Sequence, residues 1–133
     1  MSSPPVLAPS LEDIERLARD ALATIPEALR RLTQGVVVRV EEFPDEETER
    51  EMEIESPFDL LGLYRGVGIE GRDNPRTGTE PDMVFLYRRP LLDYWCETGE
   101  DLAHLVRHVM IHEIGHHFGF SDDDMEALEA ETE

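Results

Sequence analysis

The chain has 133 residues, of which 31 are acidic and 12 are basic, so its formal net charge is −19 at pH 7. This length predicts a single domain, and the hydrophobic fraction of 40% is sufficient for one core. Such an acidic chain repels phosphate backbones and anionic membranes, which argues against nucleic acid and membrane partners. Basic peptides would be attracted, although a high acidic charge more often only keeps a protein in solution.

The single cysteine, Cys96, excludes an intramolecular disulfide and a cysteine-rich zinc site. It follows Tyr94 and Trp95, and we expect it to be a small buried hydrophobic residue. The first ten residues have neither the basic nor the apolar region of a signal peptide, and no apolar run reaches the roughly 20 residues of a membrane span. We therefore expect a cytoplasmic protein, with a monomer as the default oligomeric state.

The first third of the chain predicts an arm and two helices. Residues 1–9 are rich in proline and serine and are expected to form a flexible arm before a domain at 10–133. Ser10 is a predicted N-cap, with Asp13 as a weak capping-box partner. The apolar residues that follow recur at helical spacing up to Pro26, and a second, short helix should end at Gly35.

The middle of the chain predicts three strands. The β-branched run at 36–40 is the first, residues 59–67 are the second and residues 83–87 are the third. The acidic stretch at 41–55 is interpreted as a solvated loop or edge segment, because like charges repel and little of it can be buried. Residues 66–81, rich in glycine and proline, are predicted to be a loop.

The last part of the chain predicts helices. A short one begins at Pro90, and a long one runs from about Glu100 to Phe118 and ends at Gly119. A final short helix follows, with Ser121 as its cap. The predicted fold class is α+β: a single domain in which a small mixed sheet packs on helices, including one long helix that carries the motif described next.

The segment from His112 to Asp122 reads HEIGHHFGFSD. His112 and His116 are four residues apart, so on a helix both imidazoles can bind one metal ion. Glu113 is rotated by about 100° from His112 and can reach a metal-bound water without being a ligand. Gly119 can adopt a positive φ just past the helix, which would return Asp122 to the metal. Three such ligands and a water would make a catalytic zinc site.

This segment resembles the HExxHxxGxxH/D signature of metzincin-like peptidases, in the variant with aspartate as the third ligand. Over about residues 11–128 the chain resembles the small bacterial zincin-like family of minimal metallopeptidases. The resemblance implies a zincin-like fold, a Zn²⁺ site at His112, His116 and Asp122, and Glu113 as the general base of peptide hydrolysis. The blocks that carry it are IPEALRRL, VVVRVEEFP, LLGLYRG, PDMVFLYRRPLLDYW and VRHVMIHEIGHHFGFSDDDM.

Three functions remain open on the sequence alone. The leading hypothesis is a zinc metallopeptidase acting on a peptide or protein substrate, which the strand at 83–88 would bind by β-addition. The second is a non-catalytic zinc-binding protein, in which the metal holds the last helix to the long one. The third is an acidic interaction module with a vestigial site.

Several residues near the motif also have two interpretations. Asp123 or Asp124 could replace Asp122 as the third ligand. Gly115 allows either close approach of a strand or substrate, or tight packing, and Met125 lies either under the site or in the core. His104 and His108 continue the four-residue spacing upstream, which would allow a second metal site, although single histidines on a helix are more often surface or capping groups. His117 points about 100° away from His116 and is expected beside the site or on the surface.

Overall fold

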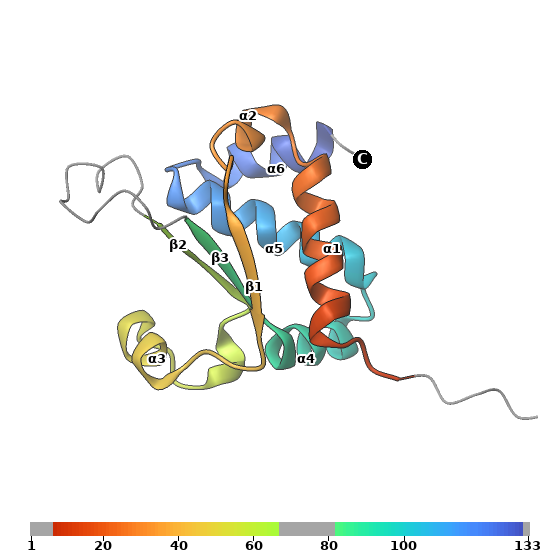
Figure 1. The fold of residues 1–133 in the computed structure, drawn as a ribbon, viewed down its shortest axis with the longest axis vertical. Coiled ribbons are helices and arrows are strands. Elements are labelled where there is room, and N and C mark those ends of the chain that lie inside the picture. Colours follow the sequence, from red (N-terminus) through yellow and green to blue (C-terminus); the bar gives the residue numbers. More distant parts are fainter. Residues whose placement is uncertain (1–6, 67–81, 132–133) are drawn as a thin grey trace, which may run out of the picture.

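The computed structural model describes residues 7–66 and 82–131. It is a mixed α/β domain, in which a three-stranded sheet packs with helices (Figure 1). The elements in chain order are α1 (Leu11–Thr24), α2 (Glu27–Arg30), β1 (Val37–Glu41), α3 (Glu46–Met52), the 3-10 helix η1 (Pro57–Asp59), β2 (Gly62–Arg65), β3 (Met83–Tyr87), α4 (Arg88–Thr98), α5 (Leu102–His117) and α6 (Asp122–Glu131). The predicted fold class is confirmed.

The sheet has the strand order β1-β3-β2. β1 runs parallel to β3, with Val38 opposite Val84, and β2 runs antiparallel to β3, with Leu63 opposite Phe85. β3 is therefore the central strand and is paired along both edges. The expectation that the strand at 83–88 binds an extended substrate is wrong, because its backbone hydrogen-bonding groups are already used within the sheet.

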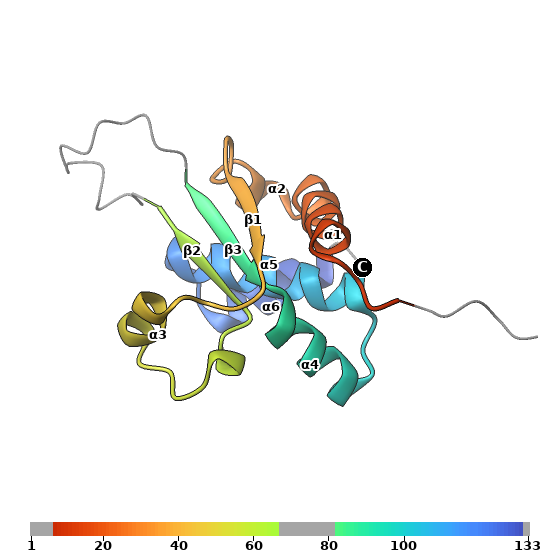
Figure 2. The same ribbon diagram turned by 60° about the horizontal axis from the view of Figure 1, so that its bottom comes forward.

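The core lies between the sheet and the long helices. α1 and α5 pack on each other, α1 also packs on β1, and α5 packs on β2 and β3 (Figure 2). Val84 and Leu86 of the central strand are fully buried, as are Ile14 of α1 and Met110 of α5. Gly62 allows β2 to lie close to α5, because a Cβ atom at this position would be 2.9 Å from Val109 Cγ1. This packing sets the distance between α5 and the sheet.

The acidic stretch at 41–55 contains a helix, so the loop prediction is wrong there. Asp45 caps α3 by accepting a 2.7 Å hydrogen bond from the Thr48 amide, and Thr48 is buried. The Arg65 guanidinium on β2 bonds to Glu51 at 2.9 Å, which offsets part of the repulsion between the carboxylates. Glutamate is also a good helix former, and this tendency outweighs its charge once a cap is present.

Two further expectations need correction. Cys96 is exposed, because on α4 it lies five residues after the buried Leu91 and so about 140° away from the buried face. The predicted strand at 59–67 is shorter, since η1 occupies its beginning and β2 spans only Gly62–Arg65 in the described residues. Most of the predicted loop at 66–81 and residues 1–6 of the arm lie outside the described residues.

The predicted cap of the first helix is confirmed, whereas the predicted end of the second is not. Ser10 and Asp13 form a complete capping box at α1, with hydrogen bonds of 2.9 and 3.1 Å. The short helix α2 ends at Arg30, earlier than its predicted end at Gly35, which has a φ of 80° in the turn that follows. Gly99 has a φ of 71° at the C-cap of α4. None of the helices in 7–66 and 82–131 is long and apolar enough to cross a membrane.

Candidate metal centre

Helix α5 carries the candidate site on one face. Asp101 caps it by accepting a hydrogen bond from the His104 amide, and its apolar side chains are buried against the sheet and α1. The four-residue spacing brings three histidines of the chain to neighbouring positions along the helix: the rings of His108 and His112 have centroids 4.1 Å apart, and those of His112 and His116 are 5.9 Å apart.

The end of α5 is a glycine turn that reverses the chain. Gly119 has a φ of 83°, in the left-handed region that only glycine adopts without strain. Its amide donates to the His116 carbonyl, and the Phe120 amide donates to the Gly115 carbonyl at 2.8 Å, which is the hydrogen-bond pattern of a Schellman motif. The positive φ predicted for Gly119 is confirmed.

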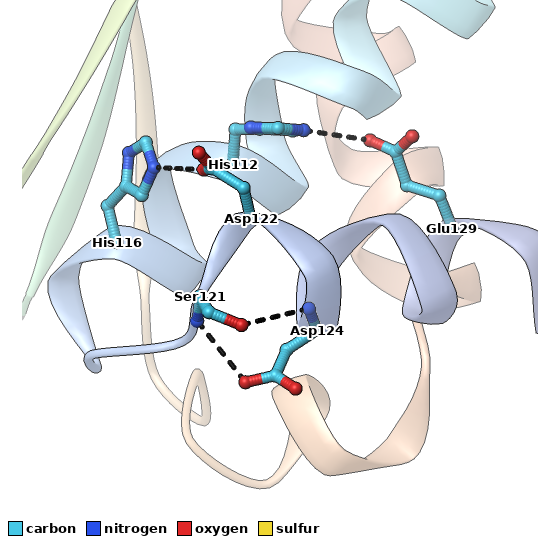
Figure 3. A network of polar contacts seen from close by, with 6 residues as sticks. All are labelled: His112, His116, Ser121, Asp122, Asp124 and Glu129. Atoms are coloured by element: carbon cyan, nitrogen blue, oxygen red, sulfur yellow. Dashed lines mark hydrogen bonds and ion pairs between the residues drawn. The ribbon is translucent and has the colours of Figure 1, made fainter.

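The turn leads directly into α6 and places Asp122 beside His116. Figure 3 shows the Asp122 carboxylate pointing at the His116 ring, with 3.3 Å between Oδ1 and Nε2. Donor atoms of His112, His116 and Asp122 all lie within 4.8 Å of one another. Two imidazoles and a carboxylate are a donor set that zinc accepts, so these residues fit the implied metal.

The neighbouring aspartates have other positions. Ser121 and Asp124 form the capping box of α6: the Ser121 hydroxyl accepts from the Asp124 amide at 3.1 Å, and the Asp124 carboxylate accepts from the Ser121 amide at 3.2 Å (Figure 3). Asp124 is thereby engaged at the helix end. Of the three aspartates, Asp122 is the one that joins His112 and His116 in a cluster.

Glu113 is the partly buried acid next to this cluster. Burial raises the pKa of its carboxyl group to about 7, and the nearby His116 opposes this rise. Removal from water disfavours the carboxylate relative to the neutral acid. A carboxyl group with a pKa near 7 can both accept and return a proton at neutral pH, as general acid–base catalysis requires.

Gly115 and Met125 join the two helices of the site. A Cβ atom at Gly115 would lie within 2.8 Å of Met125 Cγ and closer still to its Sδ. Met125 is completely buried, in the same apolar cluster as Ile114 and Val109. Gly115 therefore serves tight packing of α6 on α5, and Met125 is a core residue that holds Asp122 near the histidines.

Several neighbours of the site were not predicted. Glu129 of α6 reaches back to α5, with Oε1 2.7 Å from His108 Nδ1 and 3.4 Å from His112 Nε2. His108 is thus part of a cluster and not an isolated surface histidine. The four-residue spacing from His108 to His116 indicates in the sequence that the three histidines share one face of the helix. The position of Glu129 beside them depends on how α6 packs on α5, which the sequence does not indicate.

His117 lies on the side of α5 that faces the sheet. Its ring stacks on Tyr64 of β2, with centroids 4.0 Å apart, and burial lowers the pKa of its imidazole. The Tyr64 hydroxyl donates a 2.7 Å hydrogen bond to Asp82, and burial raises the pKa of that hydroxyl. The stacking of Tyr64 on His117 therefore joins β2 to α5. His117 is the residue directly after His116 of the cluster.

Comparison with known proteins agrees with this geometry. A helix with two imidazoles one turn apart, followed by a glycine turn that returns a carboxylate, forms a candidate metal centre. The family model described as zincin-like metallopeptidase matches residues 33–132, and the chain belongs to this family. No curated protein matches the chain.

The glycine turn can be tested with a matched pair of variants. Gly119→Ala and Gly99→Ala each place a Cβ atom at a positive φ with nothing within 4 Å, so each should lower the free energy of unfolding by about 1–2 kcal/mol. Only Gly119→Ala should also weaken zinc binding, by about 10- to 100-fold, because the turn positions Asp122. Urea unfolding and zinc titration measure the two effects; equal zinc affinities would contradict this role of the turn.

Proposed function

We propose that the protein is a zinc-dependent peptidase in which His112, His116 and Asp122 hold the ion and Glu113 is the general base. The observation that carries this proposal is the convergence of three donor groups within 4.8 Å, next to a carboxyl group whose pKa is raised to about 7. Membership of the zincin-like metallopeptidase family supports it independently.

The proposed chemistry divides between the ion and the chain. A bound zinc ion supplies electrophilic polarisation and lowers the pKa of water towards 7. Glu113 then takes a proton from the attacking water and delivers it to the leaving amine. Its partial burial suits this role, because burial raises the pKa of the carboxyl group and so makes the carboxylate a stronger proton acceptor.

The free edge of β2 is the proposed place for the substrate. Among the described strands, β2 pairs only with β3, and its Tyr64 stacks on His117 next to the cluster. An extended peptide added to this edge would run past the metal ligands, with backbone hydrogen bonds as the main contacts. The net charge of −19 and the exposed Asp122 favour peptides with basic residues.

Metal removal and return test the proposal. Chelator-treated protein should cleave no member of a library of unstructured basic peptides, and one equivalent of zinc should restore cleavage. Thermal unfolding followed in parallel separates catalysis from stabilisation, since bound metal also stabilises the folded state by mass action. Zinc that raises the melting temperature without any cleavage would contradict the peptidase and favour the non-catalytic zinc-binding protein.

A further inference from the structure

We propose that His108, His112 and Glu129 form a second site for a divalent transition-metal ion, which shares His112 with the site of the proposed function. We call it the upstream site, and we call His112, His116 and Asp122 the downstream site. The existence of the upstream site does not depend on peptidase activity; its effect on hydrolysis rests on the proposed function.

The geometry of the upstream site is as favourable as that of the downstream site. Donor atoms of His108, His112 and Glu129 lie within 4.8 Å of one another, the same limit that holds for the downstream cluster. Glu129 Oε1 is 2.7 Å from His108 Nδ1 and 3.4 Å from His112 Nε2. Figure 3 shows Glu129 approaching His112 from one side, while Asp122 and His116 lie on the other.

The chemistry of the two sites is also matched. Each offers two imidazoles one helical turn apart on α5 and one carboxylate from α6, a donor set suited to zinc and similar ions. The upstream carboxylate is the more sheltered one: the Glu129 side chain is 18% exposed, against 85% for Asp122. Lower exposure strengthens its attraction to a cation.

Sharing of His112 makes the two sites mutually exclusive. A neutral imidazole has a single acceptor nitrogen, so His112 can bind one ion at a time. An ion at the upstream site leaves only His116 and Asp122 downstream, which are too few for a stable site. Upstream occupancy should therefore hold the ion in a state without hydrolysis.

Cobalt titration of chelator-treated protein, followed by visible absorption and calorimetry, tests this arrangement. His116→Ala with Asp122→Ala removes the downstream site alone, and His108→Ala with Glu129→Gln removes the upstream site alone. Each double variant should bind one equivalent of Co²⁺, and the unmodified chain should also bind one. His112→Ala removes a ligand from both sites and should bind at least about 100-fold more weakly.

The outcomes separate the two proposals. If the variant without the downstream site binds no cobalt, the upstream site is overturned and the proposed function is untouched. If the variant without the upstream site binds none, the metal site of the proposed function fails instead. Two equivalents bound to the unmodified chain would overturn the sharing of His112.

A single substitution tests the upstream site even if a double variant does not fold. Asp122 is 85% exposed, so Asp122→Ala should keep the fold, which circular dichroism checks. On zinc addition to this variant, the nitrogen resonances of the His108 ring should shift as the ring coordinates the ion. Unchanged His108 resonances at saturating zinc would overturn the upstream site.

Discussion

Glu113→Gln is expected to lower peptide hydrolysis by about 10²- to 10⁴-fold while zinc still binds. Glutamine has nearly the same shape as glutamate but cannot accept the proton of the attacking water, so the loss should appear in kcat. The proposed metal ligands are not altered, so zinc affinity measured by calorimetry should stay close to that of the unmodified chain.

An exposed glutamate provides the control for this experiment. Glu97 lies on the surface of α4, and Glu97→Gln makes the same replacement of side chain at another place. It should leave hydrolysis and zinc affinity unchanged. Hydrolysis by Glu113→Gln at the rate of this control would show that Glu113 is not the general base.

Met125→Ala is expected to lower the free energy of unfolding by about 2–5 kcal/mol, because it empties a completely buried position. It should also weaken zinc binding, since Met125 packs on Gly115 and holds α6, with Asp122 at its start, against α5. Urea unfolding of metal-free protein gives the first quantity, and zinc titration under fully folded conditions gives the second.

Met110→Ala is the matched control for this pair of effects. Met110 is equally buried but lies on α5 itself, so its removal should cost similar stability without releasing α6. A zinc affinity that falls equally in both variants would mean that general loss of stability, and not the contact between the helices, weakens the site.

The parts of the fold that could be predicted are those with a local physical cause. Ser10 and Asp13 form a capping box within one helical turn, and Gly119 ends α5 because the chain needs a positive φ there. The spacing of His112 and His116 follows from helical periodicity alone. These features depend on residues at most a few positions apart.

The parts that could not be predicted depend on contacts between distant segments. In α3, Glu51 pairs with Arg65 on β2. The number of charges along this segment gives no indication of a partner on a distant strand. The central position of β3 depends on its pairing with both β1 and β2. Glu129 reaches His108 only because α6 folds back along α5, so its place beside the histidines required the structure.

The donors of both proposed metal sites lie within one continuous stretch, from His108 on α5 through the Gly119 turn to Glu129 on α6. Contacts between neighbouring segments form faster than the parallel pairing of β1 with β3, whose partners are far apart along the chain. The ion can therefore be captured by a helical hairpin before the sheet has assembled. In that order of events, the metal would take part in the folding of the chain and would not bind only to the finished domain.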